Sequence, residues 1–248
     1  MLQNIGEIIL LFWRTLRVLP LAWHQRRKVF DQLFEIGNGS LLMVCILSLF
    51  IGGVLALQTG PELVKRGLSF VLGGMVGESI CKELAPVLLA ILIAGRSGSA
   101  MSAEIGSMRV YEEIDALRTM NIDPVAYLVL PRMIAIVLAL PTLVMFGIPV
   151  GWLGAAFVSA LNNRIAVGFN AFFQDLRQVV DAGDVLNGVF KSFVFAAAIG
   201  IISCHQGLIT RGGPRGIGRS VTKAVVNSIV CILILDYFLT RFLLYIQK

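Results

Sequence analysis

Three charged residues stand inside an otherwise apolar stretch, and they are the first candidates for chemistry. Glu78, Lys82 and Glu83 interrupt a run from Phe70 to Ala94 that is long enough to cross a bilayer as a helix. Charges at membrane depth are costly, so such side chains face protein or water instead of lipid tails. Glu78 and Lys82 have the spacing of an ion pair along one helix, which leaves Glu83 in need of another partner. We expect the three to line a polar cavity between helices; the alternative is that they lie at headgroup level on a helix that enters the membrane late.

A second group of charged residues lies in the compact segment from Gly95 to Pro131. Apolar residues recur at helical spacing on one side of it, namely Val110, Ile114 and Leu117. Its acidic residues fall on the other side: Glu112, Glu113 and Asp115. Arg118 suits the negative end of a helix dipole, and Asp123-Pro124 ends the helix. The segment predicts a short two-faced helix, which by itself fits either docking to a partner or a lid on the helix bundle.

The motifs of nucleotide, metal and nucleophilic chemistry do not occur in the sequence. There is no Gly-x-x-x-x-Gly-Lys-Ser/Thr loop for ATP phosphates, no His-Glu-x-x-His and no Gly-x-Ser-x-Gly. The glycine-rich run from Gly212 to Gly218 follows an apolar span and not a strand, so we interpret it as a basic turn. His205 is interpreted as a packed or interfacial histidine, and the four scattered cysteines as buried thiols. We expect no catalytic and no metal site in this chain.

The composition indicates an integral membrane protein. Of the 248 residues, 57% are hydrophobic and only 15% are charged, with a mean hydropathy of +0.84. A soluble domain usually has about 25% charged residues. The net charge of +6 comes from short basic clusters between apolar runs, which is typical of topology signals and not of a nucleic-acid surface.

Five apolar runs predict an all-α protein that forms a single domain, residues 1–248. The transmembrane helices are expected at 39–57, 70–94, 132–157, 189–209 and 221–245. Residues 1–35 predict an interfacial helix and the lead-in to the first span, and residues 162–188 a polar segment outside the membrane. The basic cluster Arg26–Lys28 puts the N-terminus in the cytoplasm, and five spans then put the C-terminus outside.

The third predicted span carries residues that shape helices. Pro141 and Pro149 predict a kinked helix, because proline cannot continue the regular hydrogen-bond ladder. Gly147 and Gly151 are one turn apart, and this spacing of small residues predicts close packing on one face.

Several short motifs resemble those of the MlaE-type (YrbE) permease family, the membrane subunits of Mla-type phospholipid ABC transporters. They are Glu83-Leu-Ala-Pro86, Ala94-Gly-Arg-Ser-Gly98, Ala103-Glu-Ile-Gly-Ser-Met108, Glu113-Ile-Asp-Ala-Leu117, Asp123-Pro124, Leu130-Pro-Arg132 and Gly212-Gly-Pro-Arg-Gly-Ile-Gly218. The resemblance covers nearly the whole chain and is most specific from Glu83 to Arg132. Ala85 and Pro214 stand where the family pattern has Gly and Ala; neither changes the expected topology.

The resemblance implies a homodimeric permease in the bacterial inner membrane that moves phospholipids between the inner and outer membranes. A cytoplasmic ABC ATPase would bind ATP and Mg²⁺, which would explain why this chain has no phosphate loop and needs no cofactor of its own. A periplasmic MCE-domain ring protein and a STAS-domain protein are further implied partners, and nucleic acid is not.

The resemblance also implies roles for individual residues. Residues 104–120 would form the coupling helix, which docks on the ATPase through Arg109, Glu112, Glu113, Asp115 and Arg118. The lining of a lipid cavity open to the periplasm would consist of Gln58, Glu78, Lys82 and Glu83. Lys82 would attract a lipid phosphate and Glu83 would restrain it, while apolar faces of the first, second and fifth spans hold the acyl chains.

Two other functions stay open at this point. A secondary transporter would use Glu78, Glu83 and Asp236 as ion sites without an ATPase, but such carriers usually show an internal repeat. A membrane scaffold would assemble other subunits without forming a lipid path.

Overall fold

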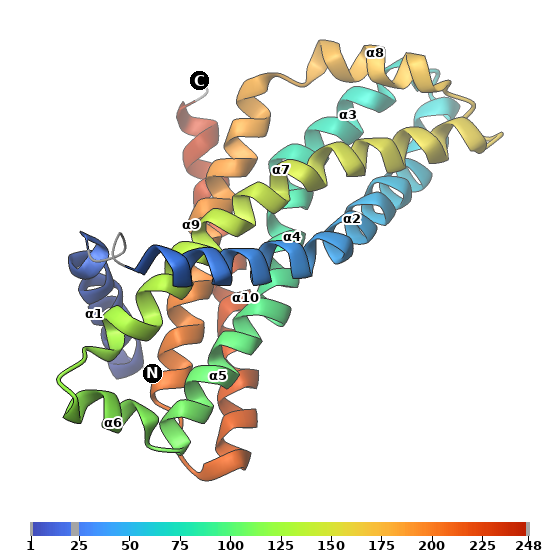
Figure 1. Cartoon of the computed structure of the whole chain (residues 1–248). Helices are drawn as coiled ribbons and strands as arrows, with labels where there is room; N and C mark the ends of the chain where they lie inside the picture. The colour runs from blue at the N-terminus through green and yellow to red at the C-terminus, as the bar shows by residue number, and fades with distance from the viewer. Residues whose placement is uncertain (1, 21–24, 247–248) are drawn as a thin grey trace. The chain divides into compact units, whose positions relative to one another are not determined.

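The computed structural model describes residues 2–20 and 25–246. Within these ranges every element of secondary structure is a helix, and short turns connect the helices (Figure 1). Four stretches in the described ranges are long and apolar enough to cross a membrane. They are α2 (Arg26–Lys65), η5 with α7 (Val125–Leu161), α9 (Ala182–Leu208) and α10 (Gly213–Ile246) up to Tyr245. The predicted all-α membrane architecture is therefore confirmed.

The second predicted span is an uninterrupted helical run made of short segments. They are a 3-10 turn, η2 (Ser69–Val71), then α3 (Leu72–Ser79), the π-helical η3 (Ile80–Leu84), α4 (Ala85–Ile93), the π-helical η4 (Ala94–Gly98) and α5 (Ser99–Val110). Pro86 has no N–H to donate to the carbonyl of Lys82, so one hydrogen bond of a regular α-helix is missing at this point. No single segment here has the length of a span, and the count of five spans stays a prediction.

The chain divides into two compact units. The first unit contains residues 1–40, 90–140 and 193–248, and the second contains residues 41–89 and 141–192. Four helices contribute residues to both units: α2, α4, α7 and α9. The single domain expected from the sequence stays a prediction.

The first unit is built around a cluster of buried apolar side chains from α1 (Leu2–Val18), α5, α6 (Glu113–Thr119), η5 (Val125–Val129), α7 (Leu130–Leu161) and α9. The cluster consists of Leu11, Ile105, Ile114, Leu128, Val129, Met133, Ile201, Ile202 and Cys204. In α1 only one side faces this core, since Leu11 is buried while Leu10 and Trp13 are exposed. Two-faced packing of this kind suits the interfacial helix expected at the N-terminus. His205 is buried beside the core, with its Nε2 3.3 Å from the carboxylate of Glu7, as expected for a packed histidine.

The predicted coupling helix, residues 104–120, is two helices instead of one. The segment α5 ends at Val110, and Glu112 adopts a left-handed conformation (φ 62°) before α6 begins. The prediction of one continuous helix is wrong, because the chain turns at Tyr111 and Glu112. The turn allows Ile114 to become fully buried in the core of the first unit.

The second unit contains close helix contacts at glycines. A Cβ on Gly52 of α2 would lie 1.9 Å from the carbonyl oxygen of Gly151 in α7, and one on Gly154 would lie 2.1 Å from the carbonyl oxygen of Leu49. The predicted close packing around Gly147 is also found, since a Cβ there would lie 2.6 Å from a methyl group of Leu89. These glycines let two backbones meet directly.

Two segments that lie outside the predicted spans are largely helical. The polar segment 162–188 contains α8 (Phe169–Val179), which lies alongside α3 in the second unit (Figure 1). Its buried Phe172 packs so tightly that a Cβ on Gly73 would lie 2.1 Å from the Phe172 carbonyl oxygen. The expected basic turn at 212–218 is wrong in extent, because α10 begins at Gly213 and continues through the basic residues. Only the left-handed Gly212 and Gly213 mark the turn.

Candidate functional site

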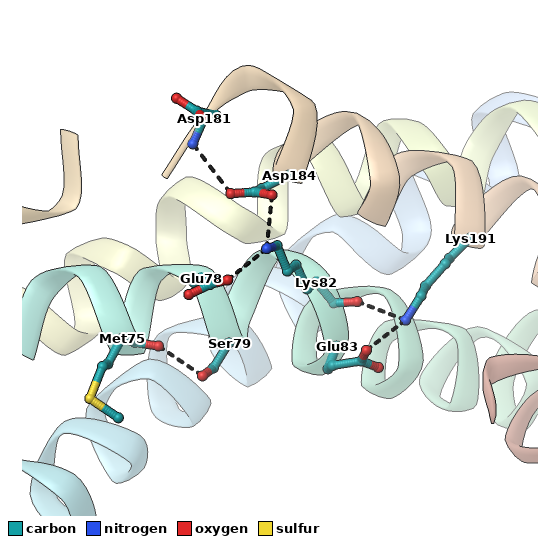
Figure 2. Close-up of polar contacts among 8 residues, drawn as sticks. All are labelled: Met75, Glu78, Ser79, Lys82, Glu83, Asp181, Asp184 and Lys191. Atoms are coloured by element: carbon teal, nitrogen blue, oxygen red, sulfur yellow. Dashed lines mark hydrogen bonds and ion pairs between the residues drawn. The ribbon is translucent and has the colours of Figure 1, made fainter. Parts of the chain in front are cut away.

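A cluster of five charged side chains lies in the second unit, where η3 meets the start of α9 (Figure 2). Its members are Glu78, Lys82, Glu83, Asp184 and Lys191. The predicted pair is present, with Lys82 Nζ 2.6 Å from Glu78 Oε1. The same ammonium lies 3.0 Å from Asp184 Oδ1, so Lys82 bridges two carboxylates from different helices.

The partner that the sequence left open for Glu83 is Lys191. Its Nζ lies 2.8 Å from Glu83 Oε1 and donates a second hydrogen bond of 3.0 Å to the carbonyl oxygen of Lys82. In a regular α-helix this carbonyl would accept a hydrogen bond from the backbone N–H of residue 86, which is a proline and has none. The Lys191 ammonium therefore donates the hydrogen bond that the backbone cannot. The Lys191 side chain is only 2% exposed, and such a buried cation requires partners of this kind.

Asp184, Gly188 and Lys191 lie on one face of α9, since their spacing of four and three residues returns to the same side of a helix. Gly188 allows the close approach of this face, because a Cβ there would lie 2.2 Å from the carbonyl oxygen of Cys81. Asp184 accepts a hydrogen bond of 3.3 Å from the backbone N–H of Asp181, near the N-terminus of α9, where a carboxylate is favoured. One face of α9 thus presents three groups to η3: the carboxylate of Asp184, the glycine that allows close approach, and the ammonium group of Lys191.

The structure brings together three of the four predicted cavity residues. Gln58 is not part of the charged cluster and lines an apolar groove of about 330 Å³ in the second unit. The groove is lined by Phe50, Ile51, Val54, Leu55, Gln58, Leu84 and Leu88. Sequence reasoning missed Asp184 and Lys191, the first because it was assigned to a polar outer segment and the second because a lone lysine in the fourth span was overlooked. Their shared helix face was the available signal.

The cluster has a formal charge of −1, because three carboxylates face two ammonium groups. An ammonium has three N–H donors, and Lys82 already directs two of them at carboxylates. One donor of Lys82 is not used in these two ion pairs, and the cluster as a whole holds η3 on α9.

The α5–α6 turn in the first unit carries the other predicted site residues. Arg109 and Arg118 both contact Asp115 Oδ1, at 2.7 and 3.3 Å. Glu112 and Glu113 are exposed beside them, while Ile114 on the opposite side is buried. The predicted two-faced character is confirmed for α6, which presents a charged surface fixed from behind by the core.

Comparison with known proteins shows similarity along most of the chain. The family model described as Permease MlaE matches residues 29–242. A probable ABC transporter permease protein of Synechocystis sp. is 40% identical over 215 residues, which cover 87% of this chain and 81% of that protein. A probable ABC transporter permease protein of Rickettsia prowazekii is 38% identical over 213 residues, or 86% of this chain and 82% of that protein. The Arabidopsis thaliana chloroplastic protein TRIGALACTOSYLDIACYLGLYCEROL 1 is 38% identical over 228 residues, or 92% of this chain and 64% of that protein.

Proposed function

The chain belongs to the MlaE permease family, and from this premise we propose that it moves phospholipids between the inner and outer membranes of a bacterium. It is an ABC transporter permease subunit, and in our proposal a separate subunit binds ATP and Mg²⁺ and performs hydrolysis. A lipid substrate is consistent with the name of the Arabidopsis relative, which is that of a glycolipid.

The observation that carries the lipid proposal is the apolar groove of the second unit. Its lining on α2 extends from Phe50 to Gln58, which is about 12 Å at the helical rise per residue. Apart from Gln58 the lining is hydrocarbon, as an acyl chain requires, and its volume of about 330 Å³ lies within the usual range for ligand sites. The Gln58 amide provides one hydrogen-bonding group for an ester or headgroup.

The charged cluster has a defined part in this proposal. Glu83 directly precedes Leu84, whose side chain lines the groove, so the polar and apolar lining come from the same helical turn. Lys82 attracts the lipid phosphate through its remaining donor, and Glu78 and Glu83 limit how tightly the phosphate is held. Release is then as feasible as capture, which a transporter needs.

The proposal is tested by filling the groove. Val54, which is 48% exposed, would become tryptophan, and the lipid bound by the purified transporter would be measured by mass spectrometry together with lipid-stimulated ATP hydrolysis. We expect Val54→Trp to lose bound phospholipid. The matched control is Leu42→Trp on the same helix, where the residue is 71% exposed and does not line the groove. Equal lipid content in both variants would refute the groove as the lipid site.

The partners in this proposal follow from the family and the exposed surfaces. A cytoplasmic ABC ATPase docks on the charged face of the α5–α6 turn through Arg109, Glu112, Glu113, Asp115 and Arg118. Two copies of the chain form the permease in the inner membrane. An MCE-domain ring protein binds on the periplasmic side, and a STAS-domain protein accompanies the ATPase.

The alternative function is that of an ion-coupled carrier, and transport assays distinguish it from an ATP-driven permease. The relatives named as ABC transporter permeases favour ATP as the energy source. We expect lipid transfer in proteoliposomes to need the ATPase and ATP and to continue when ion gradients are collapsed. Loss of transfer on collapsing the gradient, with ATP present, would favour the carrier. A scaffold would show no lipid crosslinks to groove residues.

A further inference from the structure

A polar pocket of about 300 Å³ lies in the first unit, where the first turns of α2 meet η5 and the start of α7. Its lining residues are Lys28, Asp31, Gln32, Tyr127, Leu128, Pro131 and Arg132. None of them belongs to the lipid groove or to the charged cluster of the second unit. The pocket has no role in the function described so far.

Two of the side chains that line the pocket are cations. Lys28 and Arg132 share the lining with one carboxylate, that of Asp31, and Arg132 is also paired with Glu104, which lies outside the lining. Gln32 adds an uncharged amide donor to the same lining. Two cations and an amide around a small polar cavity form a suitable set of donors for a phosphate group.

Both cations are held in place before any ligand binds. Lys28 Nζ lies 3.0 Å from the centre of the Tyr127 ring, which fixes the ammonium at the pocket wall. Arg132 donates to Glu104 Oε2 at 2.8 Å and to the Leu128 carbonyl oxygen at 3.0 Å. Its Nε is buried and has no hydrogen-bond partner among the described residues.

The position of the pocket on α2 favours an anion and a membrane surface. The helix begins at Arg26 without an acidic residue in its first turn, so the positive end of its dipole is not neutralised there. Phe30 and Phe34 are 66% and 69% exposed, and their spacing places them on the side of the helix opposite Lys28 and Gln32. Transfer of exposed phenylalanine side chains from water to lipid is favourable.

We propose that this pocket binds the phosphate of an anionic phospholipid headgroup in the leaflet that surrounds the first turns of α2. Phe30 and Phe34 place this part of the helix in the outer layer of the hydrocarbon, and the pocket on its other side receives the headgroup. The bound lipid ties α2 to η5 and α7. The site is independent of the proposed transport function, because it concerns a lipid that stays in place.

The test measures lipid binding to the full chain in neutral detergent by native mass spectrometry, with dioleoylphosphatidylglycerol as the probe. We expect Lys28→Gln to weaken binding roughly tenfold, the effect of losing one charge-assisted hydrogen bond. The control Arg27→Gln removes the same charge from the neighbouring exposed residue and is expected to change binding less than about twofold. Tyr127→Leu removes the ring beneath the ammonium and should weaken binding several-fold without changing the charge.

Two further arms identify the ligand. Dioleoylphosphatidylcholine, which has no net charge, is expected to bind more weakly than phosphatidylglycerol, and millimolar inorganic phosphate is not expected to displace the lipid. Equal losses in Lys28→Gln and Arg27→Gln would overturn the site in favour of general surface charge. Unchanged binding in both Lys28→Gln and Tyr127→Leu would also overturn it. Displacement by inorganic phosphate would overturn the assignment to a lipid and point to a soluble anion.

The transport assays of the groove variants do not depend on any of these results.

Discussion

Lys191 is a full positive charge on a buried side chain, and its contacts with oxygen atoms of Glu83 and Lys82 help to explain how it is tolerated. The Glu83 carboxylate compensates the charge, and the Lys82 carbonyl takes a donor that Pro86 cannot provide. We expect Lys191→Met to destabilise the protein by about 3 to 5 kcal/mol, the usual cost of removing one partner from a buried ion pair. Thermal unfolding in detergent, followed by circular dichroism, measures the loss.

The double variant Lys191→Met with Glu83→Gln separates the ion pair from the packing of the lysine stem. Removing both charges is less costly than removing one, because no uncompensated carboxylate is left in a partly buried place. We expect the double variant to unfold at a higher temperature than Lys191→Met alone. The same or a lower unfolding temperature would show that packing of the stem, and not the ion pair, is what the lysine contributes.

The residue scale also shows which contacts a sequence can reveal. The Glu78–Lys82 pair was predictable because helical geometry alone brings residues four apart together. The Lys191–Glu83 pair joins residues 108 positions apart, and only tertiary packing brings them together. Charge alone identified Glu83 as needing a partner, but it could not select one among the many lysines and arginines of the chain.

At the scale of elements, the contact between α9 and η3 depends on one glycine. A Cβ on Gly188 would lie 2.2 Å from the Cys81 carbonyl oxygen, so Gly188→Ala must push α9 away and stretch both lysine contacts. We expect a loss of about 1 to 3 kcal/mol, the usual cost of overpacking. The control is Gly183→Ala in the same helix, where no atom lies within 4 Å, and we expect it to be neutral or mildly stabilising.

Chemical denaturation of both glycine variants provides the measurement. If Gly183→Ala destabilises the protein as much as Gly188→Ala, the effect comes from helix propensity and not from the contact with η3. A Gly188→Ala variant with unchanged stability would show that α9 can shift without cost, and the close approach would then have no structural role.

The α5–α6 turn allows charge and backbone to be tested separately. Glu112 has a positive φ, a conformation in which glycine is unstrained, so Glu112→Gly removes the carboxylate while keeping the turn. We expect this variant to fold normally and to weaken association with the ATPase partly, by roughly two- to tenfold. The double reversal Glu112→Lys with Glu113→Lys should abolish co-purification of the ATPase.

The matched control for charge reversal is Glu62→Lys, an exposed acid at the end of α2 in the second unit. It changes the net charge by the same amount as a single reversal and should leave ATPase association intact. Normal co-purification and ATP turnover in the Glu112→Lys and Glu113→Lys variant would refute docking through this face. The surface would then be better explained as a lid on the helix bundle.

Element types were predicted well, and element ends were not. Continuous apolar runs located the long helices, because burial in lipid demands such a run. The helix α8 was missed although Phe169, Phe172, Phe173 and Leu176 recur at helical spacing, because its segment was assigned as a polar one outside the membrane. The π-helical turn η3 and the left-handed Glu112 were also missed. We attribute the first to the missing N–H of Pro86 and the second to the burial of Ile114, and neither can be recognised from the composition of its segment.

At the scale of the whole molecule, we expect the helical run from Ser69 to Val110 to contain a fifth membrane crossing. Four other stretches of the residues that the structure describes are long and apolar enough to cross, and this run is divided by two π-helical turns. It carries Glu78, Lys82 and Glu83 of the charged cluster. Each of them is paired within the cluster, so these three charges do not prevent the run from lying at membrane depth. A fifth crossing places the chain termini on opposite sides.

This topology is tested with reporters that work in only one compartment. We expect a green fluorescent protein fused before Met1 to fluoresce and alkaline phosphatase fused after Lys248 to be active, because Arg26–Lys28 retain the N-terminus in the cytoplasm and five crossings export the C-terminus. A reporter inserted after Asn121, in the turn that follows α6, serves as the internal control and should report the cytoplasm. Both termini on the same side would mean an even number of crossings. If the Asn121 reporter then faced the periplasm, the α5–α6 surface would lie away from any ATPase, and its charged face would need a different partner.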